Sequence, residues 1–315
     1  MKCNRNVFVQ ILAITVSLAV PFVLIPSASR ADDVPTIRIG TTPIDAGAEP
    51  YFARQMGFFK SAGINVEITA MSNGAALAAA VASGAIDIAQ SNVVSIAAAH
   101  ERGVSFVLIA PASLYSSKIP QSALLVSRTS TIRNAKDLNG KIVAVSGLKT
   151  IAQLGPEAWI DKNGGNLSSI KFVEMPFSEM DDALAKGRVD AALISEPALS
   201  AAFAHGARLL ANAYDAIGSK FLIGVWFTTT SWARAHPDLV RKYVAVMQRT
   251  ARWANAHQRE SGRILEDETK IPVTAATRRL IFGDTLDPSE IQSTIDACVK
   301  YGIMKERFSA SDIIA

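Results

Sequence analysis

Cysteine is almost absent from this chain of 315 residues, which contains only two, Cys3 and Cys298. The sequence also lacks the HExxH, GxSxG, GxGxxG and P-loop patterns, and its four histidines lie far apart. Zinc, hydrolase and phosphoryl-transfer chemistry therefore have no recognisable motif here. We expect no metal site, no cofactor and no enzymatic activity.

The N-terminus has the pattern of a secretory signal peptide. Two basic residues precede an apolar run from Val7 to Leu24, and the small residues Ser29 and Ala31 suit cleavage. We expect residues 1–31 to be removed, which leaves Asp32 at the start of the mature protein and places that protein in the periplasm. The alternative is an uncleaved membrane anchor, but the run is barely long enough and contains Pro21.

Excess charge of one sign is also missing from the mature chain. Removing residues 1–31 takes away three basic residues and no acid, so the formal net charge of +4 falls to +1. A nearly neutral protein gives no argument for a nucleic-acid partner. Only Cys298 would survive, and one cysteine cannot form an intramolecular disulfide, so we expect it on a packed helix face.

Two blocks of alternating strands and helices predict an α/β fold with parallel βαβ units. In the first block we expect strands near residues 36–40, 65–71, 86–90 and 106–110, separated by helices near 49–60, 74–83 and 93–102. In the second block we expect strands at 141–145, 170–175 and 190–194, with helices at 150–164, 178–187 and 196–206. From Pro237 onward the pattern is helical, and those helices should pack on the first block.

Five segments carry a family resemblance: GFFKSAGINVEI, ASGAIDIAQSN, KDLNGKIVAVSG, VDAALISEPALSAA and FTTTSWARAHPDLVRKYVAVM. Because these five segments occur in this order along the sequence, the chain resembles the periplasmic substrate-binding proteins of ABC importers. The resemblance is to the branch that serves nitrate, sulfonates, taurine and pyrimidine precursors. The resemblance implies the type II two-lobed fold, in which each lobe is a mostly parallel sheet flanked by helices. Lobe 1 would comprise residues 32–122 and 229–315 and lobe 2 residues 123–228, with crossovers near Ser122–Arg128 and Gly224–Thr228.

The resemblance also implies a function. The chain would be a monomer that captures a small anionic or zwitterionic organic solute, such as a sulfonate or taurine, and delivers it to ABC permease subunits at the inner membrane. A solute-sensing module that docks onto a membrane signalling protein is the alternative. An enzyme similar to the pyrimidine-precursor synthase of thiamine biosynthesis is disfavoured, because the cysteine-rich iron-binding motif of that enzyme is missing here.

Candidate ligand contacts lie where strands lead into helices, because helix N-termini gather unpaired NH groups and a partial positive charge. In the first block they are the glycine and polar residues after the second and third strands: Ser72, Asn73, Gly74, Gln90, Ser91 and Asn92. In the second block the loop after KIVAV offers Ser146, Gly147, Lys149 and Thr150. Helix capping is the structural alternative for several of them.

Acidic and aromatic residues would add specificity to this site. Glu196 follows the strand DAALI and would pair with a cationic group on the solute, with weaker support from Asp45 and Glu49. An acid at a helix start is also favoured by the helix dipole alone. Tyr51 and Trp226 are candidates for flat contact with an organic ligand, and core packing is the alternative for Trp226.

Overall fold

The computed structural model describes residues 34–71, 74–270 and 272–315. The predicted signal peptide, Ser72 and Asn73 lie outside these residues. Within this part of the chain, no helix combines the length and the apolar character needed to cross a membrane.

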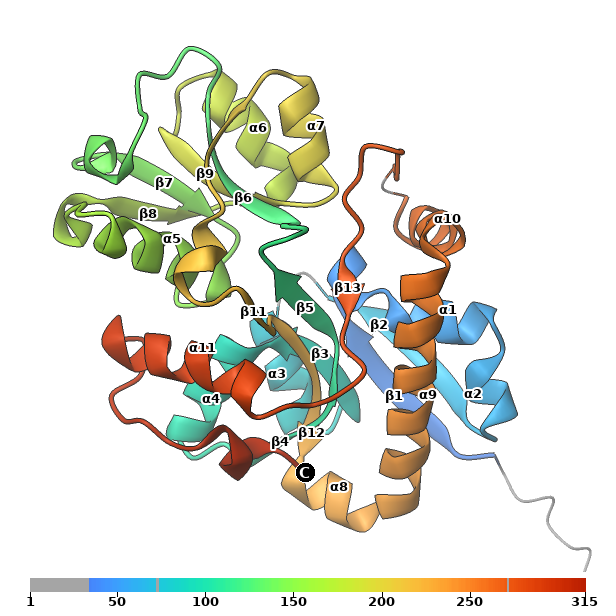
Figure 1. Cartoon of the computed structure of the whole chain (residues 1–315). Coiled ribbons are helices and arrows are strands. Elements are labelled where there is room, and N and C mark those ends of the chain that lie inside the picture. Colours follow the sequence, from blue (N-terminus) through green and yellow to red (C-terminus); the bar gives the residue numbers. More distant parts are fainter. Residues whose placement is uncertain (1–33, 72–73, 271) are drawn as a thin grey trace, which may run out of the picture. The chain divides into compact units, whose positions relative to one another are not determined.

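The first sheet combines four strands of the first block with one strand from much later in the chain (Figure 1). Its strands, in spatial order, are β2 (Asn65–Ala70), β1 (Thr36–Thr41), β3 (Ile88–Asn92), β12 (Gly224–Thr229) and β4 (Phe106–Pro111). β1 pairs in parallel with β2 and β3, whereas β12 runs antiparallel to β3 and β4. Four of its five strands run in the same direction, as expected, and the sheet is mixed because β12 enters between β3 and β4 in the opposite direction.

The second sheet has the same mixed character. Its strands, in spatial order, are β10 (Arg208–Ala211), β6 (Ser122–Val126), β9 (Ala191–Ser195), β7 (Ile142–Val145) and β8 (Lys171–Glu174). β7 pairs in parallel with β8 and β9, whereas β6 is antiparallel to β9 and β10. The two expected crossover segments are thus the full strands β6 and β12, in the second and first sheet respectively. The division into lobes stays a prediction.

A third, antiparallel sheet is formed by residues adjoining β6 and β12 and by a short strand near the C-terminus. Its strands, in spatial order, are β11 (Lys220–Leu222), β5 (Ser113–Ser116) and β13 (Ile281–Phe282). The sequence pattern predicts helix at β13, but this two-residue strand pairs with β5 instead.

The helices flank the sheets as the alternating pattern predicts. Those of the first block are α1 (Glu49–Gln55), α2 (Phe58–Ser61), α3 (Gly74–Ala82) and α4 (Val93–Glu101). Those of the second block are α5 (Ile151–Lys162), α6 (Phe177–Ala185) and α7 (Ala198–Ala204). The C-terminal helices are α8 (Thr230–Ala235), α9 (Pro237–Ala256), α10 (Gln258–Thr269) and α11 (Ser289–Lys300).

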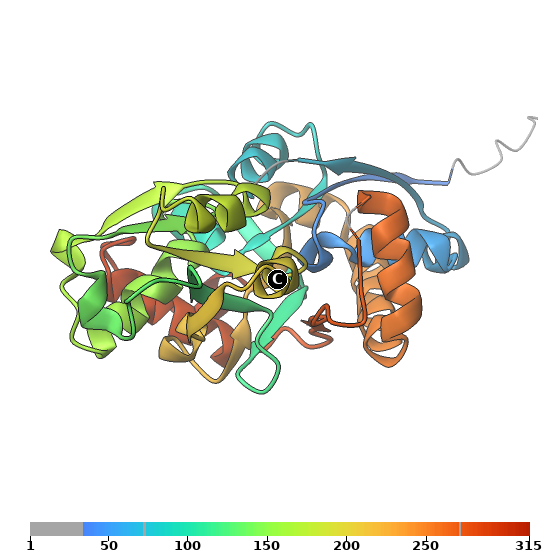
Figure 2. The same cartoon turned by 90° about the horizontal axis from the view of Figure 1, so that it is seen from above.

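The C-terminal helices pack on elements of the first block, which confirms that expectation. α9 contacts α1, α2 and β4, and α10 contacts α1. Figures 1 and 2 both show α9 and α10 beside α1. α11 contacts α4 and also α5 of the second block.

The apolar core has separate and shared parts. One cluster lies within the second block and includes Leu125, Ile194 and Leu199. A larger cluster joins both blocks, since it includes Leu108 of β4, Leu193 of β9 and residues of α5 and α11. Burial of apolar surface therefore links the second sheet to the first.

Candidate functional site

Two predicted site residues meet where β3 ends beside the start of α3. A Cβ added to Gly74 would lie 2.4 Å from Ser91 Oγ, so a side chain at position 74 would collide with this hydroxyl. Ser91 is 2% exposed, and its Oγ has no hydrogen-bond partner among the residues that the structure describes. Buried hydroxyls are normally paired, so an unpaired one beside the start of α3 is unusual.

A second polar group lies on the other face of β3, because neighbouring side chains of a strand alternate. Gln90 is 6% exposed, and its Oε1 accepts from Thr42 Oγ1 at 3.4 Å. A Cβ added to Gly224 would lie 2.7 Å from Gln90 Nε2 and 2.5 Å from Ser113 Oγ. Ser113 Oγ is also buried without a partner. Sequence analysis missed Ser113 and Gly224, although a glycine inside an apolar strand can signal such a close approach.

Asn92 has a structural role at the end of the same strand. It is the N-cap of α4: its Oδ1 accepts from Ser95 N at 2.9 Å, and its Nδ2 donates to Ser95 Oγ at 2.9 Å. Both polar ends of the Asn92 amide are therefore used within the helix start.

The predicted loop of the second block lies after β7, on a different sheet from the β3 group. Thr150 caps α5, and its Oγ1 donates to Gly147 O at 2.8 Å. Lys149 is exposed in the left-handed region, with φ 55°, and its backbone N donates to Gln153 Oε1 at 2.8 Å. Ser146 is half-buried. The capping alternative therefore accounts for the position of Thr150.

Asp45 forms a buried ion pair with Arg279. Arg279 Nε and Nη2 donate to the two carboxylate oxygens of Asp45, both at 2.7 Å, and the side chains are 5% and 8% exposed for Asp45 and Arg279. Leu280 N adds a third donor at 3.3 Å. The negative charge of Asp45 is thus balanced within the protein, and sequence analysis did not identify Arg279.

Glu49 and Trp226 contact each other in the core. Trp226 Nε1 donates to Glu49 Oε2 at 2.7 Å, and both side chains are fully buried. Burial raises the pKa of Glu49 to about 8, although the Trp226 hydrogen bond opposes this shift. Tyr243 packs edge-on against Trp226 at 5.9 Å between ring centroids. Tyr51 is also buried, with the Arg54 guanidinium 5.6 Å from its ring centroid. The structure thus places Trp226 and Tyr51 in the core.

Glu196 is engaged by protein donors as well. Its Oε1 accepts from Ser200 Oγ at 2.8 Å and from Arg278 N at 3.2 Å, and its Oε2 accepts from Ser200 N at 3.0 Å. Burial raises the pKa of Glu196, and these hydrogen bonds oppose the shift. The structure therefore places this carboxylate against α7 and the segment before β13.

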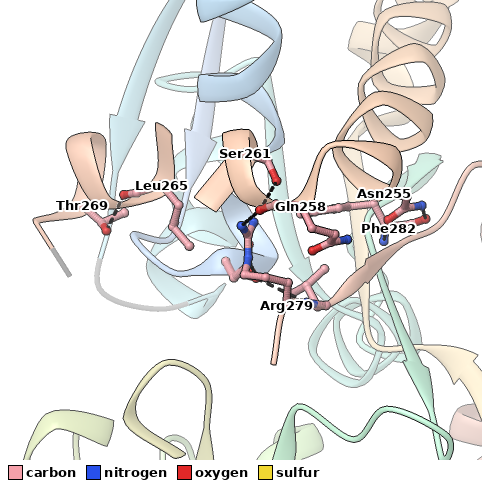
Figure 3. Close-up of polar contacts among 9 residues, drawn as sticks. Asn255, Gln258, Ser261, Leu265, Thr269, Arg279 and Phe282 are labelled. Atoms are coloured by element: carbon pink, nitrogen blue, oxygen red, sulfur yellow. Dashed lines mark hydrogen bonds and ion pairs between the residues drawn. The ribbon is translucent and has the colours of Figure 1, made fainter. Parts of the chain in front are cut away.

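A cavity of about 560 Å³ lies near the junction of α9 and α10, and none of the predicted site residues lines it. Its lining residues are Ile119, Asn255, Gln258, Thr277, Arg279 and Ile281. In Figure 3, Asn255 pairs with the backbone of Phe282, through Nδ2 to O at 2.8 Å and N to Oδ1 at 2.9 Å. Arg279 Nη1 donates to Gln258 O at 2.9 Å, whereas Gln258 Oε1 is buried without a partner. The volume is in the range of small-molecule pockets.

Metal and thiol chemistry have little support in the described ranges. Residues 34–71, 74–270 and 272–315 contain no group of three or more His, Cys, Asp or Glu side chains placed to hold a metal ion. Cys298 is fully buried, and burial raises the pKa of its thiol to about 12. The reactive thiolate is therefore disfavoured at neutral pH.

Comparison with known sequences points to one family. The family model described as NMT1/THI5-like matches residues 47–261. A protein of Bacillus subtilis (strain 168), named for binding aliphatic sulfonates, is 26% identical over 237 residues, which span 73% of this chain and 69% of that protein. The taurine-binding periplasmic protein of Escherichia coli (strain K12) is 26% identical over 212 residues, which span 64% of this chain and 62% of that protein.

Comparison with solved structures confirms the predicted periplasmic-binding-protein fold, with two mixed sheets flanked by helices. The alkanesulfonate-binding protein SsuA from Xanthomonas axonopodis pv. citri, bound to MOPS, matches with a TM-score of 0.74 at 20% identity, over 89% of this chain and 98% of that one. The desulfurization enzyme DszB matches with a TM-score of 0.65 at 15% identity, over 89% and 96% of the two chains. Binding proteins and an enzyme thus share this fold, so the fold alone does not decide the function.

Proposed function

Because the chain belongs to the NMT1/THI5-like family, we propose that it is the solute-binding component of an ABC import system. Its solute is a small organic anion of the sulfonate type. The observation that carries the proposal is the unpaired, buried Ser91 hydroxyl, which lies against Gly74 at the start of α3. A sulfonate oxygen placed there would accept from Ser91 Oγ and face the positive end of the helix.

The acidic residues favour a simple sulfonate over a zwitterion such as taurine. Asp45 is paired with Arg279, Glu49 accepts from Trp226, and Glu196 accepts from Ser200 and from a backbone N. A solute ammonium group would have to compete with these internal donors. An alkanesulfonate without an amino group avoids that competition.

The same proposal assigns a location and a partner. The mature protein acts in the periplasm after cleavage of residues 1–31 and delivers its solute, as a monomer, to ABC permease subunits in the inner membrane. The named functions of the two sequence relatives, sulfonate binding and taurine binding, support this assignment. The burial of Cys298 argues against thiol catalysis by that residue.

The test compares two variants that each remove a buried, unpaired hydroxyl. Ser91→Ala removes the hydroxyl from the proposed site, and Thr294→Val removes one from α11, where Thr294 is fully buried. Removing an unpaired buried polar group should leave stability unchanged or raise it, so both variants should fold. Calorimetric titration of the ligand-free proteins with ethanesulfonate, butanesulfonate, taurine, nitrate and acetate measures solute binding.

We expect a sulfonate to bind the parent protein and the Thr294→Val variant equally. Ser91→Ala should bind roughly tenfold more weakly, since a hydrogen bond to a charged acceptor contributes about 1.5 kcal/mol. Equal affinity in all three proteins would remove Ser91 from the site. Binding of none of the solutes to the parent protein would contradict the proposed function.

A further inference from the structure

The cavity of about 560 Å³ near the junction of α9 and α10, which we call the interhelix cavity, is separate from the proposed solute site. Its wall combines the end of α9 and the start of α10 with β13 and the turn after β5. Ser91 lies on β3 and Gly74 begins α3, and neither belongs to this lining. Cavities of this size hold small organic molecules. The interhelix cavity is therefore a candidate for a second binding site.

The side-chain amide of Gln258 is the unsatisfied group of this cavity. Its Oε1 is buried without a hydrogen-bond partner among the described residues. The nearby donors go to the backbone O of the same residue instead, from Ser261 Oγ at 3.3 Å and from Arg279 Nη1 at 2.9 Å (Figure 3). A buried amide oxygen without a donor costs free energy, so a ligand that brings an N–H or O–H group would be stabilised here.

The other two uncharged polar residues of the lining are already engaged. Asn255 uses Nδ2 and Oδ1 on the backbone of Phe282, as Figure 3 shows. Thr277 Oγ1 accepts from Thr274 N at 3.0 Å. These bonds fix the positions of Asn255 and Thr277 in the wall. Among the three uncharged polar residues, Gln258 is thus the one whose side chain is left to pair with a ligand.

Arg279 is held rigidly beside Gln258. Its Nε and Nη2 donate to Asp45, and its Nη1 donates to Gln258 O. Gly262 of α10 leaves room for this arrangement, because a Cβ at that position would lie 2.8 Å from Arg279 Nη1. A guanidinium has five N–H groups, and these three bonds leave two that can bond a ligand oxygen. Because Asp45 balances the charge of Arg279, that oxygen need not belong to an anion.

Two isoleucines supply an apolar part of the wall. Ile119 is 45% exposed, and Ile281 of β13 is half-buried. A ligand with an apolar substituent would remove both side chains from water, which favours binding. The cavity thus combines an acceptor without a donor, spare N–H groups and exposed apolar surface.

We propose that the interhelix cavity is a second binding site, which takes a small, uncharged carboxamide. The ligand N–H donates to Gln258 Oε1, and the ligand carbonyl accepts from Arg279. Its apolar substituent covers Ile119 and Ile281. A carboxylate fits less well, since it has no N–H for Gln258 Oε1 and meets a cation that Asp45 has already paired. The inference does not depend on the solute proposed for Ser91.

The test uses benzamide as the probe and isoleucine methyl groups as reporters. The ligand-free protein is labelled with ¹³C at its isoleucine methyls, and Ile119→Val and Ile281→Val variants assign the two cavity signals. Each protein is titrated with benzamide, with N,N-dimethylbenzamide, which lacks the N–H donor, and with benzoate. The test variant is Gln258→Leu. Its matched control is Gln248→Leu, at a position of α9 that is also half-buried but lies outside the lining.

We expect benzamide to shift the methyl signals of Ile119 and Ile281 with half-saturation at about 1 mM, which suits a ligand of this size. The signal of Ile194, in the core of the second block, should stay in place. N,N-dimethylbenzamide and benzoate should bind at least about tenfold more weakly, because neither can donate to Gln258 Oε1. Gln258→Leu should weaken benzamide by about the same factor, while Gln248→Leu should bind like the parent.

Three results would overturn the inference. Unmoved signals of Ile119 and Ile281 in the presence of benzamide would show that the cavity holds no such ligand. Equal affinities for benzamide and its dimethyl derivative, or for the parent and Gln258→Leu, would remove the amide pairing. Displacement of benzamide by ethanesulfonate would make the cavity part of the proposed solute site. Failure of ethanesulfonate to bind anywhere would contradict the proposed function and leave the benzamide result intact.

Discussion

At the scale of single residues, the acids predicted for the site all have partners within the protein. Asp45 meets Arg279 across 234 positions of sequence, and Glu196 meets the backbone of Arg278 across 82. Sequence reasoning could identify acids near strand ends, but not partners brought near by the folding of a distant segment. The proximity of Gly74 and Ser91 was easier to predict, since Gly74 follows β2, Ser91 lies near the end of β3, and both strands pair with β1.

Glu49 makes stability depend on pH. Its pKa is raised to about 8 by burial, so above the usual carboxyl pKa the unfolded chain releases a proton that the folded protein keeps. Stability contributed by this site is therefore complete at low pH and is lost as pH rises towards 8, by about 1.4 kcal/mol per pH unit. Glu49→Gln removes this loss and can still accept from Trp226.

The measurement is urea unfolding of the parent and Glu49→Gln at pH 5, 6, 7 and 8. The variant should gain on the parent by about 1.4 kcal/mol per pH unit between pH 5 and 7. Glu266→Gln, at an exposed position of α10, is the matched control and should show a flat difference. A flat difference for Glu49→Gln as well would mean that its carboxyl is ionised in the folded protein.

At the scale of elements, helix starts account for several residues that sequence analysis assigned to the ligand. Asn92 and Thr150 cap α4 and α5, and capping and solute binding use the same side chains at the same place. A single sequence therefore cannot separate the two roles. The strands were easier to predict, because β4, β7 and β9 coincide with apolar runs, and β1 and β2 with segments in which apolar and polar residues alternate.

Asn92→Ala decides between capping and solute contact. Loss of the cap should cost about 1 kcal/mol in the free energy of unfolding, while sulfonate affinity stays unchanged. Thr229→Ala is the matched control, because Thr229 caps α8 through a bond from Trp232 N. Chemical denaturation and calorimetric titration give the two quantities. A fall in affinity for Asn92→Ala but not for Thr229→Ala would return Asn92 to the site.

At the scale of the whole molecule, the path of the chain between the sheets could not be predicted. The segment 224–229 reads as an apolar strand, but nothing local shows that it enters the first sheet between β3 and β4. The direction of this strand is set by its pairing with β3 and β4, which lie more than a hundred residues earlier in the sequence. Residues 272–280 are likewise placed by contacts with distant segments, such as the ion pair between Arg279 and Asp45.

The apolar cluster shared by both blocks predicts cooperative unfolding. Since residues 34–315 form one compact unit with this common core, urea should unfold it in one transition. Tryptophan fluorescence and far-ultraviolet circular dichroism should then give coincident curves, because Trp159 of α5 and Trp226 of β12 report on different sheets. Two separated transitions, or a stable proteolytic fragment containing only the second sheet, would contradict this expectation.

The shared cluster also limits how the protein can be recombined with its relatives. A chimera that replaces residues 122–211 would exchange Leu154 and Leu193 but keep the α11 face formed by Ile291, Ile295 and Cys298. Because interiors are packed at crystal-like density, side chains of another shape would leave voids or overlaps against that face. Exchanging the second sheet together with α11 would preserve the packing between these two elements, although the cluster also reaches α4, β4 and β11.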